Sequence, residues 1–234
     1  MSALTVLHID SGREWRGGQR QVFLLAQGLR ARGHSQLIFS PPESPLLKRA
    51  QSAGLDVAPI IMRYDWDIRA ALSIREHVQR SHVDIMHAHD ARSHAVARLA
   101  LIGLSEPPLV VTRRVPFVPK AARIKYGNRV TRFIAVSAAV KNAMVDAGIE
   151  QSRIVVVHSG VENPPDDLSP RDWRAELNWP RDSVICGVVG AMTAEKGIDD
   201  LEPIAQALSE DAQKKIRMLL LGGKKRGRVN IGPV

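Results

Sequence analysis

Short hydrophobic runs alternate with segments of helical periodicity along residues 4–157. The runs at 4–9, 36–39 and 57–62 have the length of strands, while Val22, Leu25, Ala26 and Leu29 recur at helical spacing. Further strands are expected at 83–87, 109–112, 133–136 and 154–157, and further helices at 46–53, 68–78, 95–100, 120–128 and 137–148. This alternation predicts an α/β fold with a doubly wound, Rossmann-like parallel sheet, whose ligands bind at the carboxyl ends of the strands.

Local signals refine two kinds of element. Asp67 and Ser137 stand where a side chain is expected to cap the following helix. The β-branched run at 154–157 is typical of a parallel strand that is covered on both faces.

A change of composition after Val161 predicts a domain boundary. Residues 162–170 contain three prolines and two aspartates, which is typical of a semi-rigid linker. We therefore expect one Rossmann-like domain at 1–162, a linker with a short helix at 163–182, capped by Ser169 with Pro170 at its first position, and a second domain at 183–234. The second domain shows strands at 184–189 and 216–221 with one helix between them, so an incomplete Rossmann-like unit is predicted.

The composition of the chain indicates the cellular compartment of the protein. The 234 residues include a single cysteine, Cys186, which cannot form an internal disulfide, and no secretory signal pattern is visible. No apolar run reaches the roughly 20 residues that a membrane-spanning helix needs. A cytoplasmic protein is therefore predicted.

The net charge of +9 favours an anionic partner or simply a basic, solvated surface. Nucleic acid is disfavoured because the basic residues are dispersed and no aromatic residues interleave with them as a stacking platform requires. Arg123, Lys125, Arg129 and Arg132 form a local cluster, which predicts peripheral contact with the anionic inner face of a membrane. The alternative for this cluster is a solvated helix.

Glycines in the first strand-to-helix loop point to an anion. Gly17 and Gly18 lack a Cβ, so a ligand could approach their amides at the positive end of the following helix. Arg13 and Arg16 could add charged contacts. The alternative is a plain turn with solvated arginines. The full glycine fingerprint of dinucleotide-binding oxidoreductases is absent, which disfavours that class.

Two further patterns suggest metal chemistry. Strand alternation places His87 and His89 on one side, and such a pair can bind zinc, but neither His82 nor His94 supplies a clear third ligand. Asp65 and Asp67 imitate a D-x-D metal motif, yet the position of Asp67 before a helical pattern favours a capping role. The sequence therefore predicts no metal site.

A series of short motifs resembles family 4 glycosyltransferases. In order they are WRGGQ at 15–19, RGH at 32–34, DIMHAHD at 84–90, IAVS at 134–137, VHSGVE at 157–162, VG at 189–190 and EKG at 195–197. The resemblance implies the two-domain GT-B fold, with the acceptor on the first domain and a nucleotide-sugar donor mainly on the second. It also implies transfer with retention of configuration and without a metal or other cofactor, the nucleotide sugar being a co-substrate.

The resemblance assigns roles to individual residues. His89 would face the reacting sugar and orient donor hydroxyls and phosphate, with His87 packed in the sheet, and Gly17 and Gly18 would bind phosphate or acceptor. Gly190 and Lys196 would contact the donor diphosphate. The family's arginine after this glycine is replaced by Ala191, which weakens the donor assignment.

The paired-glutamate donor motif of the family has no clear counterpart. Glu202 and Glu210 have the right spacing but lie too early in the chain, and both are expected on one helix about 80° apart as surface charges.

The expected function is sugar transfer from a nucleotide sugar to a lipid-linked or cell-envelope carbohydrate, as in lipopolysaccharide assembly, by a hexosyltransferase. Because the second domain is incomplete, the chain is expected to be truncated and weakly active or inactive alone. The alternative is a non-catalytic remnant of such an enzyme that binds carbohydrate or phosphate.

Overall fold

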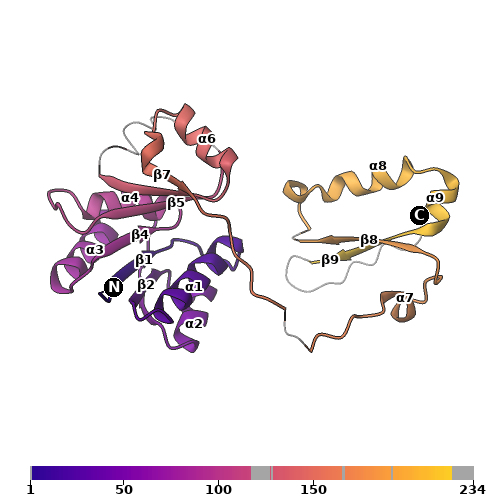
Figure 1. Cartoon of the computed structure of the whole chain (residues 1–234), viewed down its shortest axis with the longest axis horizontal. Helices are drawn as coiled ribbons and strands as arrows, with labels where there is room; N and C mark the ends of the chain where they lie inside the picture. Colours follow the sequence, from indigo (N-terminus) through magenta and orange to yellow (C-terminus); the bar gives the residue numbers. More distant parts are fainter. Residues whose placement is uncertain (1, 117–126, 128, 165–166, 191, 223–234) are drawn as a thin grey trace. The chain divides into compact units, whose positions relative to one another are not determined.

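The computed structural model describes residues 2–116, 127, 129–164, 167–190 and 192–222. Contacts within the chain divide it into two compact units, Met1–Glu162 and Asn163–Val234 (Figure 1). The described helices all fall short of the length and apolar character that crossing a bilayer requires.

The first unit is built on a seven-stranded parallel sheet of order β3-β2-β1-β4-β5-β6-β7. Its strands are β1 Thr5–Ile9, β2 Ser35–Ser40, β3 Asp56–Pro59, β4 Ile85–Ala88, β5 Leu109–Arg113, β6 Val130–Ala135 and β7 Ile154–Val156. The order grows outward in both directions from neighbouring β1 and β4, which confirms the predicted doubly wound sheet. The helices that follow these two strands belong to different core clusters, and in open sheets such a change of face places ligands at the carboxyl ends of the strands.

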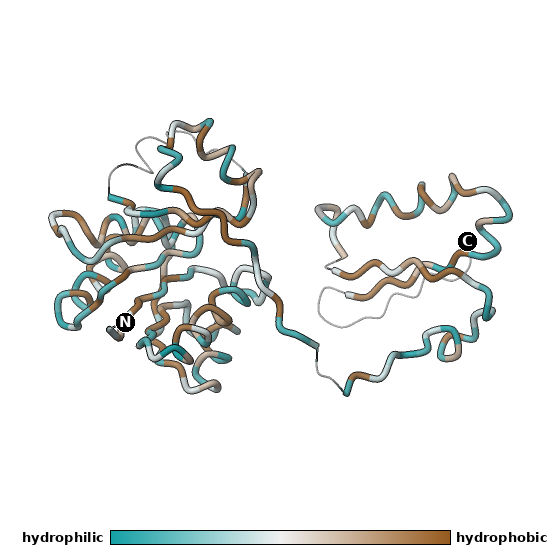
Figure 2. The backbone as a smooth tube through the Cα atoms, viewed as in Figure 1, coloured by the Kyte–Doolittle hydropathy of each residue, from teal (hydrophilic) through white to brown (hydrophobic). Residues whose placement is uncertain are grey.

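Helices cover the two faces of this sheet. They are α1 Gly17–Arg30, α2 Pro45–Ser52, α3 Ile68–Arg80, α4 Ala91–Ala100 and α6 Ala138–Asp146. The larger core cluster packs α3, α4 and α6 against one sheet face, and a smaller cluster packs α1 and α2 against β2. Hydrophobic residues are concentrated along the strands between these layers (Figure 2). Burial of the apolar stripes in two separate layers stabilises the unit.

Side-chain caps define where most of these helices begin. Asp67 accepts from the amide of Ala70, and Ser137 accepts from that of Val140, so both predicted caps are confirmed. Ser44 and Asp90 cap α2 and α4 in the same way. At α1, by contrast, the N-cap residue Arg16 makes no side-chain capping bond, and the Oε1 of Gln19 accepts from the Arg16 amide at 3.3 Å.

The outer strand β7 differs from the expectation of burial on both faces. Val155 and Val157 are 50% and 51% exposed, because β7 pairs only with β6 among the described strands and lies at the edge of the sheet. The expected helix at 120–128 lies, except for residue 127, outside the described residues.

The second unit contains a parallel pair, β8 Val184–Val189 and β9 Ile216–Leu221, which confirms the two predicted strands. Short helices flank it: α7 Trp173–Glu176, α8 Leu201–Gln206 and α9 Glu210–Lys215. The expected cap at Ser169 is wrong, because the Asp172 side chain accepts from the first-turn amides of α7. Glu202 and Glu210 are exposed as expected, but they lie on separate helices, because Ser209 caps a new helix at Glu210.

Candidate functional site

Strand alternation and register collect polar side chains on one face of the main sheet. Leu7 and Ile9 belong to the larger core cluster, so His8 between them points to the opposite face. His8 stands opposite His87 in the β1–β4 register. Gln36 on β2 has the same parity, and His89 follows directly after β4. All four polar side chains are buried, with exposed fractions of 5% or less.

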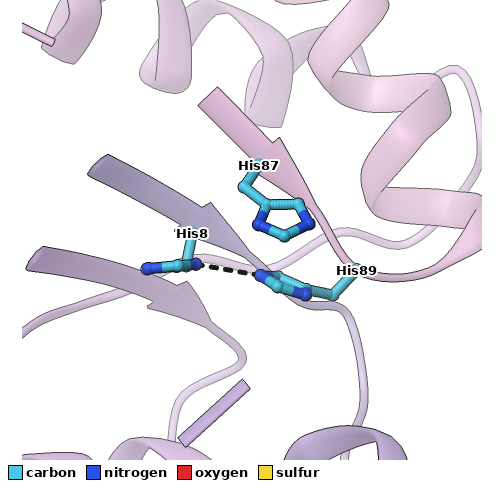
Figure 3. Close-up of side chains that lie close together, drawn as sticks. All are labelled: His8, His87 and His89. Atoms are coloured by element: carbon cyan, nitrogen blue, oxygen red, sulfur yellow. Dashed lines mark hydrogen bonds between the residues drawn. The ribbon is translucent and has the colours of Figure 1, made fainter. Parts of the chain in front are cut away.

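Three imidazoles form a compact cluster on this face (Figure 3). Nδ1 of His8 lies 2.9 Å from Nε2 of His89, and Nε2 of His8 lies 2.7 Å from Oε1 of Gln36. His87 uses Nε2 to bond Thr112 Oγ1 at 2.8 Å, and its ring centroid lies 3.9 Å from that of His89. Within the described part of the chain, the buried Nδ1 of His89 has no hydrogen-bond partner.

Burial keeps these imidazoles neutral. It lowers the pKa of His8 to about 4, although the hydrogen bond that the His8 ring makes to the Gln36 amide oxygen partly opposes this shift. The pKa values of His87 and His89 also lie well below the ordinary range, first because of burial and then because of the neighbouring imidazoles and Arg114. A neutral imidazole carries one N–H donor and one lone pair, so each ring has a definite tautomer.

The cluster corrects the sequence-based view that His87 and His89 lack a third ligand. His8 fills that place, with the three ligand atoms within 4.8 Å of one another. A divalent ion would nevertheless have to displace the His8–His89 hydrogen bond and would lie near the Arg114 cation. Three histidines are a known zinc donor set, so it is this hydrogen bond and the nearby cation that favour a hydrogen-bonded cluster over a metal site here. The sequence could have indicated His8, because strand alternation places it on the face opposite to its apolar neighbours Leu7 and Ile9.

Arg114, directly after β5, is a site residue that the sequence analysis missed. Its guanidinium donates to the backbone carbonyl of His89. A Cβ added to Gly18 would lie 3.7 Å from Cδ and Nε of Arg114, so the arginine packs beside the start of α1. Burial lowers the Arg114 pKa, while the nearby Asp10 and Asp90 carboxylates oppose that shift. The sequence could have indicated Arg114, because it stands two residues after Thr112 and strand alternation therefore places both side chains on the same face.

The glycine loop before α1 is held by Asp10. One carboxylate oxygen accepts from the amide of Gly12 at 2.9 Å and from Nε2 of Gln19 at 3.0 Å. Burial and the charge of Asp90 raise the Asp10 pKa, which the Gln19 and Gly12 hydrogen bonds partly counteract. Gly17 and Gly18, the predicted anion-binding pair, form the first turn of α1, and a Cβ at Gly17 would meet nothing within 4 Å.

The two arginines expected beside the glycines stay at the surface. Arg13 is exposed, and Arg16 forms a 2.7 Å ion pair with Glu14 in which both side chains are more than two-thirds exposed. Such surface pairs contribute little to stability. Neither arginine lines the cavity beside the histidines.

A cavity of about 120 Å³ opens beside the cluster at the carboxyl ends of the strands. Its lining includes His89, Thr112, Arg114, Gln21 and His158. A larger cavity of about 590 Å³ lies around residues 78–84 and 106–107, which precede β4 and β5, and so it is at the amino ends of the strands. Because open parallel sheets bind ligands at the carboxyl ends of their strands, the smaller cavity is the candidate site.

The segment at 157–162 is held against α1. The Gln21 side chain donates to the carbonyl of Gly160 at 2.7 Å and accepts from its amide at 3.0 Å. Arg20 pairs with Glu162 at 2.6 Å. These contacts fix one wall of the cavity.

The predicted donor residues belong to the second unit. The amide of Gly190, directly after β8, donates to the carbonyl of Leu221 at 3.0 Å. Lys196 is exposed at the end of a 3₁₀ turn, Ala194–Lys196, which Gly197 closes in the left-handed conformation at φ +68°.

The D-x-D-like pair is a structural feature of the first unit. Both Asp67 oxygens accept backbone amides, from Ala70 at 3.1 Å and from Arg63 at 2.9 Å. Asp65 instead lies 4.0 Å from Nε of Arg92. The capping role predicted for Asp67 therefore holds.

Several solved structures share the architecture of this chain. The HepE protein of Anabaena in complex with UDP-glucose has a TM-score of 0.73 at 17% identity, covering 94% of this chain and 61% of that one. A glycosyltransferase of Rickettsia africae has a TM-score of 0.72 at 20% identity, covering 94% and 69%. The lipopolysaccharide outer core galactosyltransferase WaaB has a TM-score of 0.64 at 13% identity, covering 95% and 62%.

These likenesses establish the GT-B-like fold. This chain spans about three-fifths of the length of HepE and of WaaB. Comparison with curated protein sequences finds no match. The sequence profile of Glycosyltransferase Family 4 matches residues 15–163, more than half of the 234 residues. The motif order, the fold and this match agree, and the chain belongs to glycosyltransferase family 4.

Proposed function

We propose that this chain provides the first domain of a glycosyltransferase that moves a hexosyl group from a nucleotide sugar to a lipid-linked or cell-envelope carbohydrate. The observation that carries the proposal is the meeting of two binding surfaces at one sheet edge. Arg114 and the start of α1 offer positive charge, while His89 offers a buried polar atom. A nucleotide sugar carries both an anionic diphosphate and neutral hydroxyls, so it matches both surfaces.

The anion side rests on backbone and side-chain donors together. The amides in the first turn of α1 have no side-chain cap among the described residues, and they lie at the positive end of the helix dipole. The neighbouring Arg114 is partly buried, which strengthens its attraction for a phosphate oxygen relative to an exposed arginine. Gly17 and Gly18 leave the approach open because neither carries a Cβ.

The role of the second unit in donor binding rests on family resemblance. Gly190 and Lys196 follow β8 as the family's diphosphate contacts do, and transfer with retention and without a metal belongs to the same resemblance. The HepE complex contains UDP-glucose, which makes this compound the first donor to test. WaaB acts on the lipopolysaccharide outer core, which supports an envelope carbohydrate as acceptor.

Calorimetric titration of the purified chain with UDP-glucose, UDP, glucose and inorganic phosphate tests the proposal. We expect UDP-glucose and UDP to bind, and Arg114→Gln to weaken both by roughly tenfold, the equivalent of about 1.4 kcal/mol. Arg13→Gln is the matched control, because Arg13 is an exposed arginine near the same loop that does not line the cavity. Absence of binding by any nucleotide, or equal losses in both variants, would count against the proposal.

A non-catalytic module that binds carbohydrate or phosphate is the second candidate. Ala191 replaces the arginine that normally follows the family's glycine, which favours this alternative. Radiolabelled UDP-glucose incubated with envelope carbohydrate acceptors separates the two. Binding without transfer favours the module, and transfer that His89→Ala abolishes favours the enzyme.

Peripheral contact with an anionic membrane on the cytoplasmic side completes the proposal. Of the basic cluster, Arg123 and Lys125 lie outside the described residues. Arg132 is exposed, whereas Arg129 donates to the carbonyl of Pro107 at 2.9 Å. The charge of +9 supports attraction to anionic lipid.

A further inference from the structure

A directed hydrogen-bond relay runs across three strands and ends at His89. It begins at Oε1 of Gln36, passes through both ring nitrogens of His8 and reaches Nε2 of His89, over distances of 2.7 and 2.9 Å. All three side chains are at least 95% buried, so water does not compete for these bonds. The relay joins residues that are 28 and 81 positions apart in the chain.

The chemistry of each group fixes the direction of the relay. An amide oxygen only accepts, so the bond to Gln36 requires that Nε2 of His8 carries the proton. A neutral His8 then has a lone pair on Nδ1, which must accept from Nε2 of His89. A neutral His89 that donates from Nε2 keeps its lone pair on Nδ1.

Neutral rings are what this environment favours. The centroids of His8 and His87 lie 5.7 Å apart, and those of His8 and His89 lie 5.2 Å apart. Protonating any one ring would place a cation among buried imidazoles and near Arg114, whose charge already lowers the pKa values of His87 and His89. The two-proton relay is therefore the low-energy state at neutral pH.

We propose that Gln36 and His8 are positioning residues that hold His89 in its Nε2–H tautomer, so that Nδ1 is a hydrogen-bond acceptor for a hydroxyl group of a bound sugar. The hydroxyl assignment rests on the proposed function, whereas the tautomer does not. His89 lines the cavity, and its Nδ1 is a buried atom without a partner among the described residues. An unpaired buried acceptor is costly, and a ligand O–H relieves that cost.

This tautomer divides the recognition of a sugar phosphate between two surfaces. A lone pair on Nδ1 accepts from a hydroxyl but repels a phosphate oxygen, which has no proton to give. The anionic groups are then left to Arg114 and the α1 amides, which are donors only. The arrangement therefore refines the expected role of His89, from hydroxyls and phosphate to hydroxyls.

His87 offers an internal comparison. It has the same burial and the same face, but its Nε2 bonds Thr112, and it takes no part in the relay from Gln36. Removing the Thr112 hydroxyl therefore perturbs a neighbouring imidazole without touching the Gln36–His8–His89 path. Thr112→Val is the matched control for Gln36→Met, because each variant replaces one buried hydrogen-bonding group with an apolar group of similar size.

Long-range ¹H–¹⁵N correlation spectra of the full chain labelled with ¹⁵N-histidine report each tautomer directly. Eight histidines contribute, and the His89 signals are assigned by their loss in His89→Gln. At pH 7.5 we expect pyrrole-type Nε2 and pyridine-type Nδ1 for both His8 and His89. A protonated Nδ1 on His89 overturns the proposal, because it shows the reversed relay in which the Gln36 amide nitrogen faces His8.

The variants test the part played by Gln36. We expect Gln36→Met to release His89 into a mixture of tautomers, seen as averaged or doubled nitrogen signals, and Thr112→Val to leave them unchanged. A single unchanged tautomer in Gln36→Met, or an equal shift in both variants, overturns the assignment of Gln36. The wild-type spectrum decides the tautomer even where a variant fails to fold.

Titration with UDP-glucose, with phosphate as comparison, separates this inference from the proposed function. We expect UDP-glucose to shift the Nδ1 signal of His89 and phosphate to leave it in place. The expected tautomer with no response to UDP-glucose leaves the relay standing and contradicts the hydroxyl assignment and the proposed donor. A response to UDP-glucose from a protonated Nδ1 contradicts the relay and the acceptor role of His89, and it leaves the proposed donor standing.

Discussion

The side chain of Arg114 packs beside Gly18, so that a Cβ at this glycine would lie 3.7 Å from both Cδ and Nε of the arginine. A cation from the end of β5 thus stands at the start of α1, where the first-turn amides, which no described side chain caps, concentrate positive potential. Neither group alone would define a site. Together with the histidine cluster they form the site at which we propose that an anionic sugar compound binds.

Gly18→Ala separates folding from binding. The new Cβ would make ordinary contacts with Arg114 and would raise helix propensity, so we expect thermal stability to be unchanged or higher by about 0.5–1 kcal/mol. The same Cβ obstructs a ligand at the α1 amides, and UDP-glucose affinity should fall roughly tenfold, or about 1.4 kcal/mol. Gly28→Ala on the same helix is the control and should leave affinity unchanged. Equal affinities in the two variants would remove the α1 amides from the site.

Gly12→Ala should damage the loop itself. A Cβ at Gly12 would collide with Nε2 of Gln19 and stand 2.9 Å from Oδ1 of Asp10, the two groups that hold the loop. We expect the free energy of unfolding of the first unit to drop by about 1–3 kcal/mol, as for other disrupted buried polar contacts. Gly17→Ala, where the Cβ meets nothing within 4 Å, serves as the comparison in the same urea titration. Equal stability of the two variants would contradict the role of Asp10 as the anchor.

The buried histidines should make the first unit sensitive to acid. Their pKa values are lower in the folded state than in the unfolded state. The contribution of the neutral histidines to the free energy of unfolding is therefore complete above the unfolded pKa near 6.5, and it is lost as the pH falls below that value. With a folded pKa of about 4, His8 alone should cost roughly 2 kcal/mol of stability at pH 5. Hydrogen exchange of β1 and β4 amides between pH 7.5 and 5, corrected for the intrinsic rate, measures this loss.

The matched control for the acid sensitivity is His82→Gln. The His82 side chain is 87% exposed and pairs with Asp84 at the surface, where ion pairs contribute little, so its removal should change the loss of stability far less than the buried cluster does. If the free energy of unfolding does not change between pH 7.5 and 5, the three histidines are either already protonated or accessible to water. Either result would contradict the burial of the cluster.

Limited proteolysis should cut the chain between Glu162 and Pro170. Contacts divide the chain at Glu162–Asn163, and the first unit holds its own core and complete sheet. A fragment of about residues 1–162 should therefore persist and retain protected amides in β1 and β4. Digestion that leaves no stable amino-terminal fragment would show that the first unit needs the second to fold.

Binding to anionic vesicles should depend on salt and on the basic cluster. Each arginine or lysine at an anionic surface contributes about 1 kcal/mol, so the triple variant Arg123→Gln, Lys125→Gln, Arg132→Gln should weaken cosedimentation strongly at low salt. The control variant Lys214→Gln, Lys215→Gln, Arg217→Gln removes the same charge from the second unit. Equal cosedimentation with neutral and anionic vesicles would rule out the membrane contact.

Local signals in the sequence determined the element types, most boundaries and the family. Period-2 and helical patterns are imposed by backbone geometry over a few residues, so they can be identified without knowing the partners. The caps Asp67 and Ser137 act over three residues, and they were predictable for the same reason. The cap Asp172 was overlooked, because Ser169 and Pro170 offered a competing local signal.

Only the tertiary structure decided the composition of the site. His8, Gln36 and Arg114 come from β1, β2 and the end of β5, and their meeting with His89 depends on strand order and register. Register is set by burial of apolar side chains such as Leu7 and Ile9 across the whole sheet, which no local window contains. Strand order likewise decided that β7 lies at the edge of the described sheet, although its three residues are all apolar. Sequence thus specified the polar residues, and packing of the opposite face brought them together.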